Sequence, residues 1–413
     1  MRLVGNPRGM KLYPSMLKEV TACKHKYGAD VTVSYHTDTY KPNLAGHGID
    51  AEINSFKHNL QGTIMINKST DSAFEKEIKE ALVTGRLSSG LYFRAMQTDY
   101  ATQYRWHEEV TGKLASYWSY GNGLRDYDDL ALARTLVTRL SSRGQTSYDF
   151  DDRLGHSTST LFNYDVRDFG IATALSNAET LLNQAIAEGG WYNDFSHWHW
   201  AEQYGDKDQL EQFLSQQRAL LNSVNSVSLG AGEAVEYMWL RKQFKRGGIY
   251  QDGDELVLIC DVRNENDLPY NAISQTLSVE LDVSGTILAN KEVSATSDIL
   301  KVSANNFIVQ VPYDKKDGFR AVRLKVTSEP TYLDLGLPSI VSNEVAGGQI
   351  VITADKDTKA VLFKVPTAGR LYQAEVVERS QYFSTDHGFT ETSGHDLYVG
   401  LITMSGQSSL TQI

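Results

Sequence analysis

The sequence contains little cysteine, little proline and no long apolar run. Its two cysteines, Cys23 and Cys260, are too few for a disulfide framework or a thiolate zinc site, so we expect both to be buried. Its 8 prolines and 32 glycines follow no repeating period, which excludes collagen-like and low-complexity classes. No apolar stretch approaches the ~20 residues of a membrane span, and the N-terminus has no segment of signal-peptide type. We therefore expect a globular chain without a membrane span.

The sequence also has fewer basic than acidic residues. Forty basic against 51 acidic residues give a formal net charge of -11 at pH 7. Phosphate backbones repel a chain of this sign, so we expect no nucleic-acid partner. The P-loop, the nucleophile-elbow motif G-x-S-x-G and the zinc motif H-E-x-x-H do not occur in the sequence either.

The chain is long enough for more than one hydrophobic core. Its 413 residues exceed the roughly 250 to 300 at which a single core stops growing. With 41% hydrophobic and 22% charged residues, wholesale disorder is excluded. All six tryptophans and eight of the ten histidines precede residue 240. We therefore expect any chemistry in the first part of the chain.

Strand-like and helix-like stretches alternate over the first 240 residues, which is typical of βα units on a parallel sheet. Seven such strands suit a closed (β/α) barrel, complete or one unit short, whereas a doubly wound sheet usually carries a glycine fingerprint that is missing here. The predicted strands cover 30–35, 62–67, 89–96, 114–119, 145–150, 191–195 and 223–229. The predicted helices cover 71–83, 128–141, 177–188, 206–221 and 233–244.

Beyond about residue 245 the apolar period changes to two, which predicts antiparallel β structure. The stretch 242–253 is basic and then glycine-rich, and it predicts a domain boundary. The strands expected after it cover 255–262, 276–283, 307–311, 321–326, 349–353 and 360–365. The fold class is therefore α/β, and three domains are expected: a (β/α) barrel at 1–245, a β-sandwich at 250–330 and a further β-rich segment at 331–413.

Polar side chains follow the first predicted strand to its carboxyl end, where (β/α) barrels hold their active sites. Because side chains alternate along a strand, Thr32, Ser34, His36 and Asp38 share one face. A buried parallel strand is normally apolar on both faces. A polar series that ends in His-x-Asp therefore indicates a strand face that leads to a site.

A second cluster follows the strand at 191–195. By the same alternation His197 and His199 share a face, and Trp198 lies on the opposite one. Imidazole titrates near neutral pH and aromatic faces stack on sugar rings, so the cluster suits proton transfer or metal ligation in a sugar-binding cleft. The alternative is that these rings belong to the core.

Two further strand ends carry weaker candidates. Arg94 could hold a carboxylate, although a single arginine is more often a surface residue. The stretch Tyr120-Gly-Asn-Gly123 could expose backbone N–H groups to a ligand, or it could be a simple turn.

Several of these segments resemble the NodB-like polysaccharide deacetylases, over roughly residues 30–245. The helix at 178–188, followed by Gly189-Gly-Trp191 and a strand that ends at His197, is similar to the family's last motif. The segment 113–123 is similar to its aromatic strand end, and His36-Thr-Asp38 takes the place of its first, aspartate-bearing motif. The family's second motif, a pair of histidines, has no counterpart after the second predicted strand.

The resemblance implies a distorted (β/α) barrel and metal-assisted removal of an acetyl group from a polysaccharide. A divalent ion, zinc or similar, would polarise the acetyl carbonyl and lower the pKa of a bound water. Asp38 would act as base and His197 as general acid. The expected metal ligands are His36, Asp38 and His199, and the expected substrate contacts are Trp118, Tyr120, Arg94 and Trp198.

Two other functions stay open. The chain could be a non-catalytic glycan-binding or structural component of a cell surface or virion, built on a degenerate barrel. It could also be a glycoside hydrolase, which needs two carboxylates about 5 to 9.5 Å apart, such as Asp38 with Asp149 or Asp151. The expected partner is a polysaccharide and the expected location is extracellular, at a cell surface or on a virion, whereas a homo-oligomer or larger assembly stays open.

Overall fold

The chain forms a mixed α/β structure that divides into two compact units. Unit 1 comprises Met1–Asp30 and Val235–Asp334, and unit 2 comprises Val31–Ala234 and Leu335–Ile413. The three expected domains, 1–245, 250–330 and 331–413, stay a prediction. The computed structural model describes residues 18–38, 53–68, 72–82, 84–93, 100–120, 139–141, 166, 168–196, 207–252, 255–262, 276–283, 292–294, 299–312, 319–327, 332–346, 349–367, 373–386 and 394–413.

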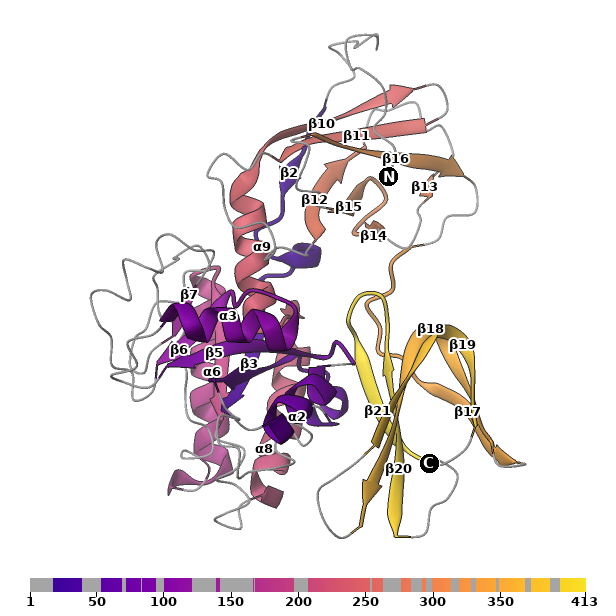
Figure 1. Ribbon diagram of the computed structural model, residues 1–413. Coiled ribbons are helices and arrows are strands. Elements are labelled where there is room, and N and C mark those ends of the chain that lie inside the picture. The colour runs from indigo at the N-terminus through magenta and orange to yellow at the C-terminus, as the bar shows by residue number, and fades with distance from the viewer. Residues whose placement is uncertain are drawn as a thin grey trace. The chain divides into compact units, whose positions relative to one another are not determined.

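Residues 31–234 of unit 2 contain a curled parallel sheet (Figure 1). Its strand order is β7-β6-β5-β4-β3-β8, and β9 also pairs with β3. Over the described residues the sheet is an open half-barrel, so closure into a full barrel is not confirmed. The strands are β3 (Val31–Asp38), β4 (Gly62–Ile66), β5 (Leu87–Phe93), β6 (Tyr117–Tyr120), β7 (Arg139–Ser141), β8 (Trp191–Ser196) and β9 (Ser226–Ser228).

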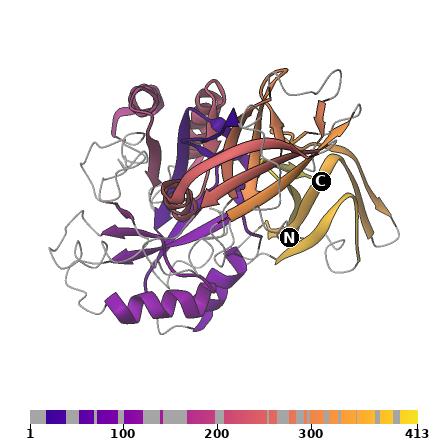
Figure 2. The same cartoon turned by 90° about the horizontal axis from the view of Figure 1, so that it is seen from above.

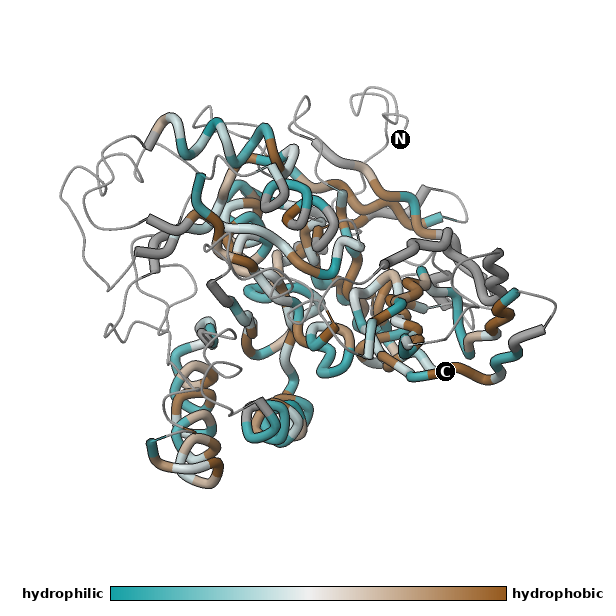
Figure 3. Tube along the Cα trace, turned by 60° about the horizontal axis from the view of Figure 1, so that its bottom comes forward, coloured by the Kyte–Doolittle hydropathy of each residue, from teal (hydrophilic) through white to brown (hydrophobic). Residues whose placement is uncertain are grey.

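The strands of this sheet fan out in Figure 2. The helices of the described ranges that cover its outer face are α2 (Ser72–Leu82), α3 (Tyr100–Thr111), α6 (Ile171–Ala187) and α8 (Lys207–Asn222). Apolar and polar residues alternate within the turns of the helices (Figure 3), because each helix buries one face. Helices α2 and α3 pack on β4 and β5, whereas α6 and α8 pack on β3 and β8. No helix of the described ranges is both long and apolar enough to cross a membrane.

The C-terminal part of unit 2 is an antiparallel sheet of order β17-β18-β20-β21, with β19 also paired to β18. The two short strands expected at 349–353 and 360–365 are parts of one 18-residue strand. Around residue 362 this strand is buried on both faces, because Phe363 packs against Phe56 of the segment 53–57. The strands are β17 (Ile340–Ala346), β18 (Gln349–Pro366), β19 (Gln373–Asp386), β20 (His395–Ile402) and β21 (Ser408–Gln412).

Unit 1 contains two antiparallel sheets, of order β1-β10-β11-β16-β13 and β14-β15-β12-β2. Residues near the N-terminus add an edge strand to each, because β1 (Lys18–Glu19) pairs with β10 and β2 (Thr21–Ala22) pairs with β12. Assembly of the two sheets into a sandwich stays a prediction. Helix α9 (Ala231–Gln243) belongs to unit 1 from Val235 onward. The other elements are β10 (Phe244–Asp252), β11 (Glu255–Val262), β12 (Thr276–Asp282), β13 (Glu292–Ser294), β14 (Ile299–Lys301), β15 (Asn306–Pro312) and β16 (Phe319–Thr327).

Three elements of the structure differ from the sequence-based expectations. No strand was expected at 244–252, where β10 directly follows α9, which ends at Gln243; the domain boundary expected at 242–253 stays a prediction. The end of the helix expected at 128–141 is strand β7, and helix α3 was not expected at all. The strand expected at 145–150 lies outside the described residues.

Both cysteines are free thiols, and burial raises the pKa of each to about 12. Cys260 is buried as expected, whereas Cys23 is only half-buried. A thiol with a raised pKa is seldom deprotonated near neutral pH, so it is a poor nucleophile. These side chains therefore act as small apolar groups.

Gly400 of β20 provides space for the ring of Phe56. A Cβ atom at position 400 would lie 2.6 Å from Cδ1 of Phe56 and 2.8 Å from its Cε1. We expect Gly400→Ala to lower the free energy of unfolding by about 1–3 kcal/mol, as overpacking of a buried contact does. Urea unfolding followed by circular dichroism measures this change.

The double variant Gly400→Ala with Phe56→Leu is the control for the steric explanation. If the ring causes the loss, the two substitutions are not additive, and the alanine costs less in the leucine background. Strict additivity would contradict the explanation.

Candidate functional site

The inner face of the parallel sheet, opposite the helices, carries polar side chains. Thr32, Ser34 and His36 of β3 share this face, as their alternation predicts, and each is completely buried. The register places His36 beside Thr63 of β4 and Ser34 beside Asn193 of β8. The inner face is therefore a closely packed polar core that extends toward the carboxyl ends of the strands.

A chain of hydrogen bonds links β3, β8 and β6 across this face. Nδ1 of His36 lies 3.2 Å from Oδ1 of Asn193, and Nδ2 of Asn193 donates to the hydroxyl of Tyr117 at 2.8 Å. The Tyr117 ring also meets the His36 ring edge-on, at 5.6 Å between centroids. A hydrogen bond between Nδ1 and this oxygen requires a proton on Nδ1, because a carbonyl oxygen can only accept.

Ser34 and Trp191 form a second link on the same face. Nε1 of Trp191 donates to Oγ of Ser34 at 2.8 Å, and that hydroxyl donates to the carbonyl of Leu229 at 2.7 Å. The Trp191 ring is 1% exposed. Trp191 therefore stabilises the junction of β3, β8 and the residue after β9, and its ring offers no open face to a sugar.

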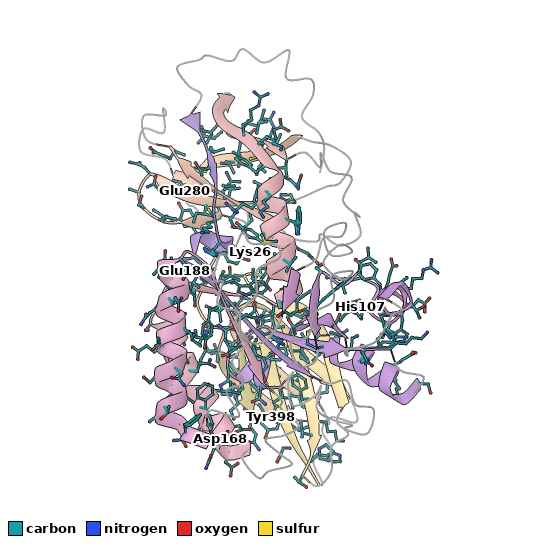
Figure 4. The ribbon with its side chains drawn as sticks, turned by 90° about the vertical axis from the view of Figure 1, so that its left-hand side faces the viewer. Lys26, His107, Asp168, Glu188, Glu280 and Tyr398 are labelled. Atoms are coloured by element: carbon teal, nitrogen blue, oxygen red, sulfur yellow. The ribbon has the colours of Figure 1, made fainter. Side chains whose placement is uncertain are left out.

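The outer face of β8 carries a buried carboxyl group, on Asp194. Its Oδ2 accepts hydrogen bonds from Nε2 of Gln217 on α8 and, at 3.3 Å, from the hydroxyl of Tyr192. Nε2 of Gln217 also donates to that hydroxyl, at 2.9 Å. These contacts fix β8 against α8. In Figure 4 the labels Asp168 and Glu188 mark the two ends of the preceding helix, α6.

The structure brings the carboxyl ends of β3 and β8 together. The two strands pair in parallel up to Thr37 and Ser196, and the backbone of Asp38 pairs with Met65 of β4. His197 follows Ser196 directly in the sequence. The side chain of Asp38 and that of Tyr120, the last residue of β6, lie outside the described part, as do the expected site residues Arg94, His197, Trp198 and His199.

Trp118 lies on the outer face of the sheet. Its ring is completely buried and meets Tyr104 of α3 edge-on, with 5.8 Å between centroids. Nε1 of Trp118 donates to the carbonyl of Ala115 at 3.3 Å. Stacking on a sugar needs an exposed ring face. The buried position of Trp118 therefore does not support the expected contact with substrate. The aromatic residue of β6 on the inner face is Tyr117.

His36 is one of the described residues with the chemistry of a metal ligand. Its Nδ1 lies 3.2 Å from an amide oxygen, and a hydrogen bond at one ring nitrogen is the usual support of a histidine that binds a metal through the other nitrogen. Within the described ranges no three His, Cys, Asp or Glu side chains gather closely enough to hold an ion. His36 thus fits one position of a metal site, and the other expected ligands, Asp38 and His199, have no described side chains.

Sequence inspection missed Asn193, Tyr117 and the Asp194–Gln217 pair. The only signal for Asn193 was its position two residues after Trp191, which places both on the same face of one strand. No motif marks Gln217 on its helix. Hydrogen bonds that join residues 76 and 157 positions apart arise only from the register of the sheet.

Comparisons with known proteins give partial likenesses only. No protein-family model and no curated protein matches the chain. It is similar to the crystal structure of a presumed polysaccharide deacetylase from Mycobacterium smegmatis, with 14% identity, 55% of this chain and 96% of that chain covered, and a TM-score of 0.40. It is also similar to the Bc1960 peptidoglycan N-acetylglucosamine deacetylase, with 16% identity, coverages of 49% and 87%, and a TM-score of 0.32. These structural neighbours are deacetylases, but likenesses this weak do not assign the chain to a family.

Proposed function

We propose that this chain is a carbohydrate-active hydrolase that removes acetyl groups from an acetylated polysaccharide. The observation that carries the proposal is the imidazole of His36, which an amide holds in one orientation near the carboxyl end of β3. The carboxyl edge of a parallel α/β sheet is where such folds bind and convert ligands.

Deacetylation needs a base that activates water and an acid that protonates the leaving amine or alcohol. We assign the base to Asp38, two residues after His36, and the acid to His197, directly after β8. The pairing of β3 with β8 up to Thr37 and Ser196 supports their proximity. Arg94, Tyr120 and Trp198 lie at or just beyond the ends of β5, β6 and β8 in the sequence, and they are the proposed sugar contacts.

A divalent ion, zinc or similar, would polarise the acetyl carbonyl. His36 would hold it through Nε2, together with Asp38 and His199. A protein that acts on such a polysaccharide works outside the cell, at a cell surface or on a virion.

Acetate release from acetylated chitin oligomers, peptidoglycan and xylan tests the proposal. We expect Asp38→Ala and His197→Ala each to lower the rate by about 10²–10⁴-fold, as loss of an acid–base group does. Asp208→Ala, on an exposed part of α8, is the matched carboxylate control and is expected to keep full activity. Bound metal is measured by mass spectrometry on the same samples. Acetate release that survives both substitutions would rule out these assignments.

Complete burial of His36 and near-complete burial of Trp191 favour a second candidate, a non-catalytic glycan-binding or structural component whose sheet interior is packed and takes no part in chemistry. Glycan binding without acetate release would assign this function. Release of reducing sugar instead of acetate would assign the chain to the glycoside hydrolases.

A further inference from the structure

We propose that Phe169 is a carbohydrate-binding residue, whose ring stacks on a sugar that lies a short way along the polysaccharide from the one that reacts. The inference deepens the proposed function and rests on it, because that function places the reacting sugar at the ends of β3 and β8. Its structural basis is an exposed aromatic ring in a fixed turn before α6, level with the carboxyl end of β8.

The ring of Phe169 is exposed to solvent although it is large and apolar. Its exposed fraction is 66%, and it is the aromatic one among the exposed large apolar side chains of the described ranges. The hydrophobic core around α6 does not include it. The space beside the next residue is open as well, because a Cβ atom built at Gly170 would meet no atom within 4 Å apart from its chain neighbours. The ring is therefore available to a ligand and contributes little to the core.

The turn that carries this ring is fixed at both ends. Val166, three residues before Phe169, is 2% exposed and belongs to the core cluster around α6. The N–H of Gly170 donates to the carbonyl of Val166 at 3.0 Å, and the N–H of Ala174 donates to the carbonyl of Gly170 at 3.1 Å. Gly170 adopts a positive φ of 83°, which favours glycine and separates the turn from α6. A ring on such a turn loses little conformational freedom when it binds a ligand.

Chain geometry places the turn at the edge of the sheet where the proposed site lies. Only residues 188–190 connect the end of α6 to the start of β8, and both elements pack in one core, so the helix runs antiparallel to the strand. The 17 residues of α6 span about 25 Å and the 6 residues of β8 about 20 Å. Phe169 follows Asp168, which Figure 4 labels at the end of α6 away from Glu188. The ring therefore lies level with the carboxyl end of β8, roughly one helix diameter, about 10 Å, from that strand.

A polysaccharide is the ligand that fits this ring at this place. A sugar ring has an apolar face of C–H groups that packs flat on an aromatic ring. The proposed substrate is a polymer, so the sugars on either side of the reacting one must pass over the edge of the sheet. Phe169 can therefore bind a second sugar of the same chain without contact with the reacting acetyl group.

Binding of short and long oligomers to the full chain tests this assignment. Isothermal titration calorimetry is carried out with oligomers of two and of six sugars from acetylated chitin and from acetylated xylan. We expect Phe169→Ala to raise the Kd of the six-sugar oligomer roughly three- to tenfold, the effect of one lost aromatic contact, and to leave that of the two-sugar oligomer unchanged. Phe169→Trp keeps an aromatic ring and should retain the wild-type Kd. Phe169→Leu keeps an apolar side chain without a ring and should bind like the alanine variant.

Val341→Ala is the matched control, because it removes another apolar side chain that is 66% exposed, on β17. We expect this variant to bind both oligomers as the wild type does. Circular dichroism checks that Phe169→Ala is folded, as expected for a ring outside the core. An unchanged Kd of the six-sugar oligomer in Phe169→Ala, an equal loss for both oligomers, or a wild type that binds no six-sugar oligomer would overturn the inference.

Binding and turnover separate this inference from the proposed function. Weaker binding of the six-sugar oligomer by Phe169→Ala, in a protein that releases no acetate from any glycan, would keep Phe169 as a sugar contact and refute the proposed function. Acetate release with the same KM for long chains in the wild type and Phe169→Ala would do the reverse.

Discussion

Replacing Arg86 by alanine is expected to lower the free energy of unfolding of unit 2 by about 3–5 kcal/mol. Arg86 lies directly before β5, and its side chain is 2% exposed. Its guanidinium donates from Nη1 to the carbonyl of Gly406 at 2.6 Å, from Nε to that of Ser55 at 3.3 Å and from Nη2 to Oδ1 of Asn59 at 3.3 Å. Alanine removes these hydrogen bonds and leaves a cavity, which explains the size of the effect.

These contacts join the C-terminal sheet to the amino-terminal edge of the parallel sheet. Arg86 precedes β5 and Asn59 precedes β4, whereas Gly406 and Gln407 lie in the turn between β20 and β21. Asn59 adopts a positive φ of 51°, donates from Nδ2 to Oε1 of Gln407 at 2.7 Å and accepts at Oδ1 from the N–H of Ser408 at 2.8 Å. The sheet of residues 340–412 is therefore attached opposite the edge of the proposed site, where it stabilises the strands.

Urea unfolding of the full chain measures the effect of Arg86→Ala. Arg105→Ala, on an exposed position of α3, is the matched control and is expected to change the free energy of unfolding by less than about 0.5 kcal/mol. Arg86→Lys keeps the charge but not the planar set of donors, so we expect an intermediate loss. Equal losses in Arg86→Ala and Arg105→Ala would show that these hydrogen bonds contribute nothing.

The sequence predicted the strands best where an apolar run ends at turn residues. Strand β11 has the bounds that the alternation gave, 255–262. Strand β10 was not predicted from the sequence, because it contains Gly247 and Gly248 and glycine is rare in strands. The structure supplies the reason for the first of these glycines, since a Cβ at 247 would lie 2.4 Å from Cγ2 of Val20. Helix α3 was not predicted because its apolar pattern is sparse: Trp106 and Val110 are its residues in the hydrophobic core shared with α2.

Part of the candidate site was predictable from the alternation of one strand, and part was not. Alternation placed Thr32, Ser34 and His36 on one face without any knowledge of neighbours. It could not tell which of Tyr117 and Trp118 faces inward, because the choice depends on how β6 pairs with β5. The partners of His36 come from strands far away in the sequence, and only the register of the sheet brings them together.

Acidification from pH 7 to pH 4 is expected to destabilise unit 2 through two buried histidines, His58 and His107. Burial, joined for His58 by the neighbouring Lys57, lowers the pKa of each to about 4 from an ordinary 6.5. His107 lies on α3 (Figure 4), with Nδ1 2.9 Å from the carbonyl of Lys113. Both rings are almost inaccessible to water, 3% and 1% exposed, so the folded chain resists their protonation.

The sign of the effect follows from which state binds the proton. Above pH 6.5 both rings are neutral in the folded and the unfolded chain, and their stability contribution is fully present. As the pH falls toward 4 the unfolded chain takes up a proton on each ring, whereas the folded chain does not. We expect a loss of about 3 kcal/mol for each histidine, complete once the pH is below about 4.

Urea unfolding at a series of pH values between 7.5 and 4 measures this loss. His58→Gln removes one titrating ring, and His107→Asn removes the other while keeping a donor near the carbonyl of Lys113. Each variant should lose about 3 kcal/mol less than the wild type over this range, and the double variant about twice that difference, because carboxylate titration is common to all four proteins. A double variant whose stability falls as steeply as that of the wild type would show that acid acts on this fold through its carboxylates and not through these two rings.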